Sequence, residues 1–492
     1  MSARIRGVED DLNALNRAFL SRDRRFEGRF VAGVVTTGVY CRPGCPAPLP
    51  KAKNVRFFPG PAAAEAEGFR PCRRCRPEAS PGTPVLLGTG ATVSRALRLI
   101  GTGAAGSGLD TLASRLGVGQ RHLRRLFEEH LGAPPAAVVR THRTHFARRL
   151  LDETTLPVTE VADGAGFASL RSFHRAIHET FGRPPRELRR SARNAVVPPE
   201  AAIRLRLPYR PPFDWKGLLD FLGARVLPGV EEIRDGVYRR TVRTEEGKGG
   251  VLSVRPIPEA GTLEIVLPPD CVPDLLPIAG RLGRLFDLDA DPAVIGSDLS
   301  RDPLLARLVA LRPGLRIPGA WDPFETAVRA VLGQQITVRG ATTLAGRLVT
   351  RFGEELLGLA GDGPRFLFPG PAVLKTADVG SIGVPAVRAE AIRTLARWVV
   401  DGRVDLEGSR GPAALERELT SIPGIGPWTA QYLAMRVLGE PDAFPDGDLG
   451  LLRALSRLGV SVSRRALVRR ADAWRPWRAY ATMHLWMSEE PS

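Results

Sequence analysis

The sequence predicts a multidomain protein that is mainly α-helical with α+β parts. The chain has 492 residues, which is too long for one ordinary core, and 43% of them are hydrophobic, enough to fill several cores. Between turn-forming breaks, the hydrophobic pattern changes from helical spacing to alternating strand spacing and back. The breaks, rich in proline and glycine, lie at 79–84, 195–200 and 312–319. We therefore expect four domains, over residues 1–82, 88–195, 200–312 and 313–492.

The charge of the chain favours a polyanionic partner. Its formal net charge is +17, and only five of its 70 basic residues are lysines. Arginine forks bind phosphate oxygens through paired hydrogen bonds, so nucleic acid is the first candidate. The alternative is an arginine-rich composition that reflects only a GC-rich genome. No apolar run is long enough to span a membrane and no targeting signal is visible, so we expect a cytoplasmic protein without a membrane partner.

The first domain contains two closely spaced cysteine pairs. Cys41 and Cys45 form a C-x3-C pair, and Cys72 and Cys75 form a C-x2-C pair. Two such pairs across a short folded segment suit one tetrahedral Zn²⁺, with all four thiolates as ligands. A zinc-bound thiolate can also act as a nucleophile if it is reachable. The alternative is a zinc site that only folds the domain. The fifth cysteine, Cys271, is isolated and is expected to be a small buried apolar residue.

The segments around these cysteines resemble a known repair domain. T-T-G-V-Y-C-R-P-G-C at 36–45 and G-F-R-P-C-R-R-C at 68–75 resemble the methylphosphotriester-acceptor domain of the bacterial adaptive-response (Ada) proteins. The resemblance implies that Cys41 accepts a methyl group from a methylated DNA phosphate. Four thiolates on Zn²⁺ carry a net charge of about −2, so methylating one of them halves a charge that opposes DNA binding.

One part of this domain departs from the family pattern. The segment after the second cysteine is usually basic in the family, but here it is P-A-P at 46–48. We therefore expect Lys51, Lys53 or Arg70 to contact the DNA phosphate instead.

The second domain is helical throughout and contains two similar helix-turn-helix units. Each has a short apolar helix, a turn at Gly117 or at Gly166, and a second helix with one basic face. A long helix over 134–151 joins the units. With the closing segment F-G-R-P-P-R-E-L-R at 181–189, this plan resembles the AraC-type DNA-binding domain.

That resemblance implies that the second helix of each unit lies in a major groove of promoter DNA. A solvated helix face is the alternative for any single arginine. The candidates for base or phosphate contact are Gln120, Arg121, Arg124, Arg171, Ser172 and Arg175.

The third domain has the pattern of an antiparallel α+β fold. Strands are expected at 202–207, 237–242, 250–254 and 262–267, with helices near 215–225 and 273–286. No catalytic cluster is visible here, so we interpret this domain as a scaffold.

The fourth domain contains L-T-S-I-P-G-I-G-P-W-T-A at 419–430, which predicts a helix, a tight turn and a second helix. Gly424 and Gly426 would let the backbone approach a phosphate of duplex DNA closely, without reading its sequence. The alternative is a plain helix–helix turn.

Downstream of this helix-hairpin-helix lies D-A-F-P-D-G-D-L-G at 442–450. The combination resembles the helix-hairpin-helix DNA glycosylases, in particular the 3-methyladenine DNA glycosylase II (AlkA) enzymes, over about 203–489. The resemblance implies that Asp448 is the catalytic aspartate, with Asp446 as the nearby alternative. A carboxylate there would stabilise an oxocarbenium-like sugar or activate the attacking water.

The same resemblance assigns an aromatic pocket to Trp428, Tyr432 and Trp486, whose faces could stack on a cationic alkylated base. Core packing is the competing interpretation for Trp474 and Trp477. The family's apolar wedge, which fills the space left by the extruded base, corresponds to Gln335 here. Bifunctional relatives carry a lysine at the position of Trp428, so we expect a monofunctional enzyme that leaves an abasic site.

The sequence thus predicts an all-α glycosylase domain joined to an Ada-type zinc domain and an AraC-type regulator. The P-C-H-R methyltransferase motif of the usual Ada protein is absent. The expected function is an adaptive response to DNA alkylation that combines base release, methyl acceptance and transcriptional regulation. The expected partners are alkylated and promoter double-stranded DNA and RNA polymerase, at the nucleoid of a bacterial cytoplasm. The alternative is an AraC-type transcription factor whose glycosylase half is catalytically inactive and only holds DNA.

Overall fold

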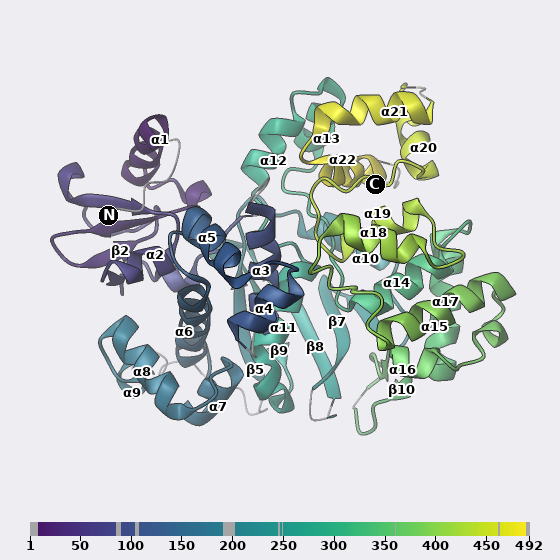
Figure 1. Cartoon of the computed structure of the whole chain (residues 1–492), viewed down its shortest axis with the longest axis horizontal. Helices are drawn as coiled ribbons and strands as arrows, with labels where there is room; N and C mark the ends of the chain where they lie inside the picture. The colour runs from purple at the N-terminus through teal and green to yellow at the C-terminus, as the bar shows by residue number, and fades with distance from the viewer. Residues whose placement is uncertain are drawn as a thin grey trace. The chain divides into compact units, whose positions relative to one another are not determined.

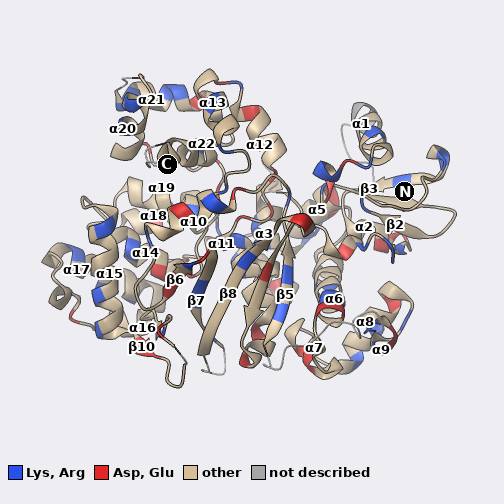
Figure 2. Cartoon of the chain, turned by 180° about the vertical axis from the view of Figure 1, so that it is seen from behind, with Lys and Arg blue, Asp and Glu red and all other residues tan. Residues whose placement is uncertain are grey.

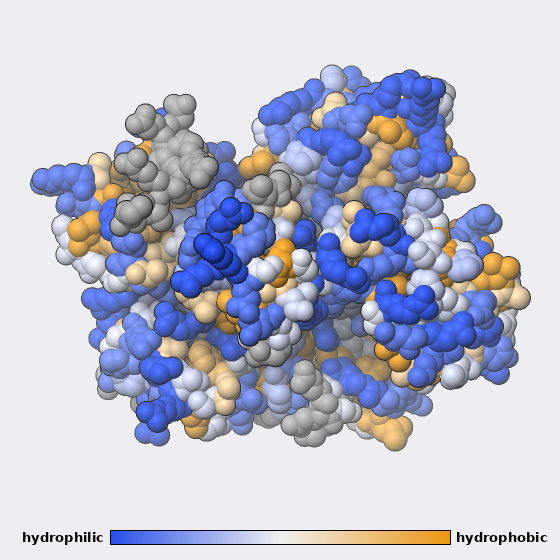
Figure 3. All heavy atoms as spheres, in the orientation of Figure 1, coloured by the Kyte–Doolittle hydropathy of each residue, from blue (hydrophilic) through white to orange (hydrophobic). Residues whose placement is uncertain are grey.

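A computed structural model describes residues 8–84, 90–103, 108–189, 202–244, 247, 249–359, 361–460 and 463–488 (Figure 1). The chain forms two compact units. The first comprises 1–210, 257–280 and 288–290, and the second comprises 211–256, 281–287 and 291–492. Within the described ranges, the helices are too short or too polar to cross a lipid bilayer. The face drawn in Figure 3 is mainly hydrophilic, with apolar residues scattered over it.

The first unit begins with a small domain built on a four-stranded sheet of order β3-β1-β2-β4. The central strand β1 pairs antiparallel with β2 and β3, whereas β2 pairs parallel with β4. Phe30 and Phe57 form an edge-to-face pair in the core, with ring centroids 5.4 Å apart. The elements are α1 (Val8–Leu20), β1 (Val31–Val34), β2 (Val39–Cys41), β3 (Val55–Phe58), α2 (Pro61–Ala66) and β4 (Arg70–Pro71), with 3-10 turns Arg24–Phe26, Ala52–Asn54 and Pro77–Ala79.

Within the described residues from 90 to 189, helices α3 to α9 follow and include the two predicted helix-turn-helix units. The turns lie at Gly117 and Gly166, whose φ angles of +67° and +74° favour glycine. In the first helix-turn-helix unit, Leu112, Leu123 and Phe127 are buried in one apolar cluster. The helices are α3 (Ala91–Gly101), α4 (Leu109–Arg115), α5 (Gln120–Leu131), α6 (Pro135–Glu153), α7 (Val158–Gly164), α8 (Leu170–Phe181) and α9 (Pro185–Leu188).

The strands of the next region pair antiparallel, as predicted. In the first unit, β5 (Ile203–Pro208) pairs with β9 (Thr262–Leu267). In the second unit, β6 (Glu231–Arg234), β7 (Val237–Arg243) and β8 (Gly249–Ile257) form a meander. The remaining elements are α10 (Trp215–Gly223), the 3-10 turns Pro258–Ala260 and Pro269–Asp274, and α11 (Leu275–Leu285).

Strand β6 was not predicted, because its sequence E-E-I-R lacks an apolar pattern. It forms because Asp235 and Gly236 both have positive φ, 53° and 72°, as a two-residue hairpin turn requires. The Asp-Gly dipeptide was therefore the signal that could have revealed it.

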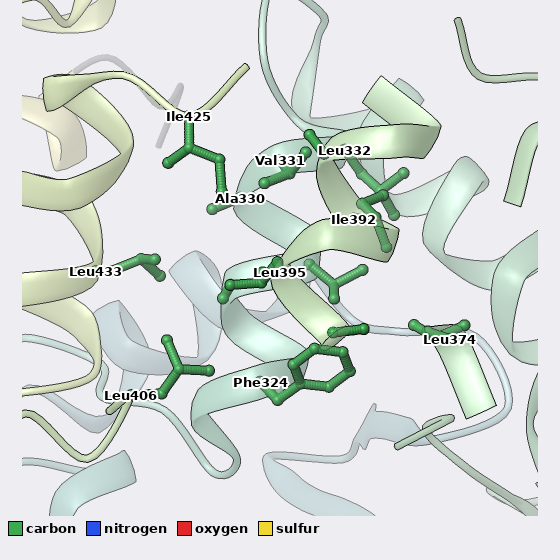
Figure 4. Packing of buried hydrophobic residues seen from close by; sticks show 14 of the residues in the cluster. Phe324, Ala330, Val331, Leu332, Leu374, Ile392, Leu395, Leu406, Ile425 and Leu433 are labelled. Carbon is green, nitrogen blue, oxygen red and sulfur yellow. The ribbon is translucent and has the colours of Figure 1, made fainter. Parts of the chain in front are cut away.

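The rest of the second unit is almost entirely helical, and its core packs α14, α15, α17 and α19 together. Figure 4 shows Phe324 and Val331 of α14, Ile392 and Leu395 of α17 and Leu433 of α19 pointing toward one another. Several of the helices begin with an aspartate whose side chain accepts a backbone N–H, followed by proline, as in α12, α13 and α14.

The bounds of these elements are α12 (Pro292–Leu299), α13 (Pro303–Leu311), α14 (Pro323–Leu332), α15 (Val338–Phe352), β10 (Glu354–Glu355), β11 (Phe366–Leu367), α16 (Pro371–Leu374), a 3-10 turn Val379–Ile382, α17 (Ala386–Val400), α18 (Pro412–Thr420), α19 (Pro427–Arg436), α20 (Leu449–Arg457), α21 (Arg464–Ala471), a 3-10 turn Asp472–Trp474 and α22 (Arg478–Met487).

The predicted fold class is confirmed: a small cysteine domain, paired helix-turn-helix units, an antiparallel α+β region and an all-α domain. Cys271 is buried, with 1% of its surface exposed. The break expected at 195–200 lies outside the described residues.

Candidate functional sites

The parallel pairing of β2 with β4 brings the two cysteine pairs together. Cys41 is the last residue of β2, and Cys72 directly follows β4. The amide of Cys72 donates to the carbonyl of Tyr40 over 3.0 Å, which fixes the two strand ends side by side. The four sulfur atoms of Cys41, Cys45, Cys72 and Cys75 lie within 4.8 Å of one another.

This spacing fits one tetrahedral metal ion. Zinc–sulfur bonds of about 2.3 Å give sulfur–sulfur separations of about 3.8 Å. Four soft sulfur donors are the ligand set that structural zinc prefers.

The expected methyl acceptor is covered, while several cationic side chains of the same domain are exposed. Cys41 has 5% of its surface exposed, and Cys72 is the only one of the four ligands that is half-buried. The three predicted phosphate contacts, Lys51, Lys53 and Arg70, are all exposed. Sequence reasoning overlooked Arg73 and Arg74, which are exposed between the ligands of the second pair.

A buried polar cluster joins the strand that carries Cys41 to helix α6. The Tyr40 hydroxyl donates to Glu65 over 2.9 Å, and the Glu65 carboxylate also accepts from His145 over 2.9 Å and from Thr141 over 2.6 Å. Burial alone would raise the pKa of Glu65 and lower that of His145, but their mutual attraction outweighs it, so the pKa of Glu65 is lowered and that of His145 is raised. The pair is therefore ionic.

The predicted DNA-recognition residues differ in whether their side chains already bond other residues of the protein. Gln120 bonds Asp110, and Arg124 pairs with Glu128 over 3.0 Å. Ser172 donates to the carbonyl of Ser169 over 2.7 Å, and its amide is capped by the Ser169 hydroxyl, so it shapes the start of α8. The three other candidates are exposed: Arg121, Arg171 and Arg175.

The predicted helix-hairpin-helix is formed by α18, the turn and α19. Gly424 has φ +90°, and a Cβ there would lie 3.2 Å from that of Ala391, so this position requires glycine. Gly426 has open space where a Cβ would stand. The hairpin therefore presents bare backbone ahead of the N-terminus of α19, where anions are favoured.

The position of the predicted wedge lies beside this hairpin. Gln334 donates to the carbonyl of Gly424 over 2.9 Å, and Arg388 donates to the carbonyl of Gln334 over 2.7 Å. The next residue, Gln335, is exposed and has φ +58°, a conformation that is uncommon for a residue other than glycine. Ile336 beside it is 39% exposed. The hydrogen bonds of Gln334 therefore hold the exposed residues Gln335 and Ile336 next to the hairpin.

Asp448 is the N-cap of α20 and is held by three N–H donors. Its Oδ1 accepts from the Leu451 amide over 3.1 Å and from the Trp486 indole over 3.1 Å, while its Oδ2 accepts from the Trp428 indole over 2.9 Å. The alternative, Asp446, instead pairs with Arg464 over 3.0 Å. Of the two carboxylates, only Asp448 is bonded to the aromatic residues.

The aromatic rings form a continuous set around Asp448. Trp428 stacks on Tyr432, with centroids 5.4 Å apart and planes 14° apart, and Tyr432 lies 6.3 Å from Trp486. Phe221 stacks on Trp486 at 6.2 Å and 20°. Phe221 belongs to α10, in the region that we had interpreted as a scaffold, so sequence reasoning missed it.

Trp474 and Trp477 have a different role from the pocket tryptophans. Their exposed fractions are 2% and 6%. Trp474 donates to Asp302 and Trp477 donates to Asp298, each over 2.9 Å. They anchor the C-terminal segment to α12 and α13, in keeping with the competing interpretation of core packing.

The fold and sites combine a helix-hairpin-helix and a cluster of aromatic rings bonded to Asp448 with a preceding four-cysteine metal domain and paired helix-turn-helix units, the parts of a DNA-binding protein. Three family models match it: the metal binding domain of Ada at residues 14–78, a helix-turn-helix domain at 112–191 and the AlkA N-terminal domain at 204–322.

Similarity to known proteins along the whole chain identifies its family more narrowly. The chain is 43% identical over 487 residues to the "Probable bifunctional transcriptional activator/DNA repair enzyme AlkA" of Mycobacterium tuberculosis, covering 98% of this chain and 97% of that one. It is 35% identical over 287 residues to the "DNA-3-methyladenine glycosylase 2" of Escherichia coli, covering 58% of this chain and 96% of that one. A solved structure, the 3-methyladenine DNA-glycosylase from Archaeoglobus fulgidus, shares the fold with a TM-score of 0.50 at 24% identity, covering 57% of this chain and 97% of that one.

The chain therefore belongs to the family of bifunctional transcriptional activator/DNA repair enzymes of the AlkA type. It holds a single Zn²⁺ site formed by the four cysteines of its Ada-type domain.

Proposed function

We propose that this protein hydrolyses the N-glycosidic bond of alkylated bases of the 3-methyladenine type in double-stranded DNA. The observation that carries the proposal is the carboxylate of Asp448, held by the indoles of Trp428 and Trp486 beside a hairpin that can bind a DNA backbone. In the reaction, the bond between C1′ and the base nitrogen breaks and its electron pair leaves with the base. Asp448 stabilises the positive charge that develops on the sugar. Water then adds to C1′ and loses a proton to solvent.

We also propose that the enzyme is monofunctional. A strand-cleaving glycosylase needs an amine that attacks C1′. The residue at the hairpin position that would supply it is Trp428, whose indole nitrogen is not nucleophilic and donates to Asp448. The expected product is an intact strand with an abasic site, which breaks only after treatment with alkali.

The test is base release from methylated duplex DNA by the wild type and by Asp448→Asn. Asparagine keeps the size of the side chain and removes its charge. We expect release by the wild type and a loss of about 100-fold or more in the variant, as for removal of one electrostatic catalytic group. Equal, absent release by both proteins would favour the alternative of an activator whose second half only holds DNA.

The Ada-type domain supports a second activity, methyl transfer to Cys41. The bond between the methyl carbon and the phosphate oxygen breaks, the carbon bonds to Sγ of Cys41, and the phosphate regains its negative charge. The exposed cations Arg70, Arg73 and Arg74 would hold that phosphate. Intact-mass analysis after incubation with methylphosphotriester DNA should show the gain of one CH₂, mapped to Cys41. A Cys41→Ser variant should not gain it, and an unmodified wild type would exclude the activity.

Loss of one negative charge at the metal site would strengthen DNA binding, which links methyl acceptance to the paired helix-turn-helix units. We propose that the methylated protein binds promoter DNA and recruits RNA polymerase, at the nucleoid in a bacterial cytoplasm. Footprinting and in vitro transcription with methylated and unmethylated protein test this step. Equal occupancy by both forms would refute it.

A further inference from the structure

One face of helix α19 carries a ladder that ends in a buried cation. Trp428, Tyr432 and Arg436 are spaced four residues apart, so they lie above one another on the helix. Trp428 stacks on Tyr432, and the guanidinium carbon of Arg436 lies 5.5 Å from the Tyr432 ring centroid. The first rung bonds Asp448, so a negative charge lies at one end of the ladder and a positive charge at the other. Eight residues of helix separate the outer rungs by about 12 Å.

Arg436 is fixed by its contacts as firmly as Asp448 is. It is 7% exposed and donates to the Tyr432 hydroxyl over 2.7 Å, to the carbonyl of Pro318, and to the carbonyl of Gly319 over 3.4 Å. Its guanidinium carbon also lies 5.0 Å from the ring centroid of Phe221. Burial lowers the pKa of Arg436, but a guanidinium keeps its proton in proteins. The charge is therefore permanent.

Neighbouring buried charges do not cancel that of Arg436. Glu231 and Glu325 pair with Arg240 and Arg329 at N–O distances from 2.9 to 3.4 Å. The charges of these two carboxylates and two guanidinium groups sum to zero. Arg436 adds one positive charge behind the aromatic rings. The aromatic cluster is therefore not a site that only attracts cations, because the Arg436 guanidinium already lies over the rings of Tyr432 and Phe221.

We propose that Arg436 is a positioning residue whose charge drives positive charge from the alkylated base toward the sugar. This inference rests on the proposed base release. A cationic base held on these rings would be repelled by Arg436, and it becomes neutral as the electron pair of the breaking bond moves onto it. The positive charge then lies on the sugar, next to Asp448. The field between Arg436 and Asp448 thus destabilises the bound state and favours the transition state.

The proposal predicts different effects on binding and on chemistry. Removal of the charge should slow bond breaking for every lesion, because the leaving base no longer gains electron density near a cation. For a cationic lesion, binding should become tighter, because ground-state repulsion is lost. For a neutral lesion, binding should stay unchanged. For a unit charge on Arg436 and one on a base at the far end of the ladder, taken as one ladder length or about 12 Å apart, an effective dielectric constant of 20 gives an interaction equivalent to about tenfold in rate.

The experiment is single-turnover base release with the full-length protein in excess over the DNA. One duplex carries a 7-methylguanine, which is cationic, and a matched duplex carries a hypoxanthine, which is neutral. The rate constant at saturation and the half-saturating protein concentration are measured for the wild type, Arg436→Gln, Arg436→Lys and Tyr432→Phe. Lysine keeps the charge, while Tyr432→Phe removes the hydroxyl that Arg436 contacts and leaves the charge. Thermal unfolding checks that each variant is folded.

For Arg436→Gln, we expect a rate constant about tenfold lower on both duplexes and a lower half-saturating concentration on the 7-methylguanine duplex alone. Arg436→Lys should recover most of the rate. An unchanged rate in Arg436→Gln, weaker binding on both duplexes, or a lysine variant as slow as the glutamine variant would each overturn the proposal. If hypoxanthine is not released by the wild type, the opposite shifts of rate and half-saturation on 7-methylguanine still decide. A wild type that releases neither base, and no 3-methyladenine from methylated duplex DNA, would instead refute the proposed function.

Discussion

The hydrogen bonds from two indoles to Asp448 provide the sharpest test of the proposed catalytic site. Trp428→Phe and Trp486→Phe each keep a six-membered aromatic ring but remove the N–H that bonds the carboxylate, at 2.9 and 3.1 Å, together with the five-membered part of the indole. A hydrogen bond to a charged group contributes about 1.5–3 kcal/mol. If that bond aims the carboxylate at the sugar, each variant should release bases about 10- to 150-fold more slowly. The Leu451 amide still holds one oxygen and the carboxylate keeps its charge, so the loss in either variant should not exceed that of Asp448→Asn in the same assay.

The assay compares single-turnover rates with affinities for two uncleavable duplexes. One carries a pyrrolidine ring, a cation in place of the sugar, and the other carries a neutral tetrahydrofuran. We expect both variants to lose affinity for the first duplex and to bind the second as the wild type does. Trp477→Phe is the matched control, because it removes an equally short bond to Asp298 outside the pocket; it should lower stability and leave the rate unchanged. Wild-type rates in both pocket variants, or equal losses on the two duplexes, would refute the argument.

Three further perturbations test other parts of the molecule. Cys72→Ser should lose the bound Zn²⁺, measured by metal analysis, and unfold the first domain, because structural zinc contributes directly to folding. The pKa of His145 is raised in the folded state, so its protonation stabilises the fold below the unfolded-state pKa of about 6.5, and this stabilisation is lost as pH rises through the folded-state pKa. The unfolding free energy measured with urea should fall over this pH range, and His145→Gln should remove that dependence. Gly424→Ala, at φ +90°, should weaken binding to undamaged duplex DNA and cost about 1 kcal/mol or more of stability; wild-type affinity would contradict a role of the hairpin in binding.

Much of the fold could be predicted because its signals are local. The spacing within each cysteine pair, the glycine turns between amphipathic helices and the P-G-I-G hairpin each lie within about ten residues. Strand β6 was missed because its residues E-E-I-R carry no apolar pattern and it pairs only through the turn at Asp235 and Gly236. The polar cluster of Tyr40, Glu65 and His145 could not be predicted either, since its members lie up to 105 residues apart.

Among the predicted site residues, some positions follow from the local sequence, whereas other contacts depend on how distant helices pack. A helical repeat places Trp428 and Tyr432 on one face, so their stacking follows from the sequence. Nothing local indicates that Trp428 and Trp486 both bond Asp448, because the N–H directions depend on how α19, α20 and α22 pack. Phe221 was missed because it lies about 200 positions earlier and its own segment has the ordinary apolar spacing of α10.

The place of Phe221 changes the role of the sheet region within the second unit. Helix α10, which carries it, contacts β6, and β6 and β7 carry Glu231 and Arg240. These two residues bond Glu325 and Arg329 of α14, in the helical core. Removing one member of such a buried cluster leaves an uncompensated charge and costs about 3–5 kcal/mol, so sheet and helices cannot shift independently at low energy. The strands therefore act as more than a scaffold, because they hold α10 and with it Phe221, which stacks on Trp486. Arg240→Met should disturb Phe221 and slow base release, although Arg240 pairs with Glu231 and Glu325 and not with Asp448.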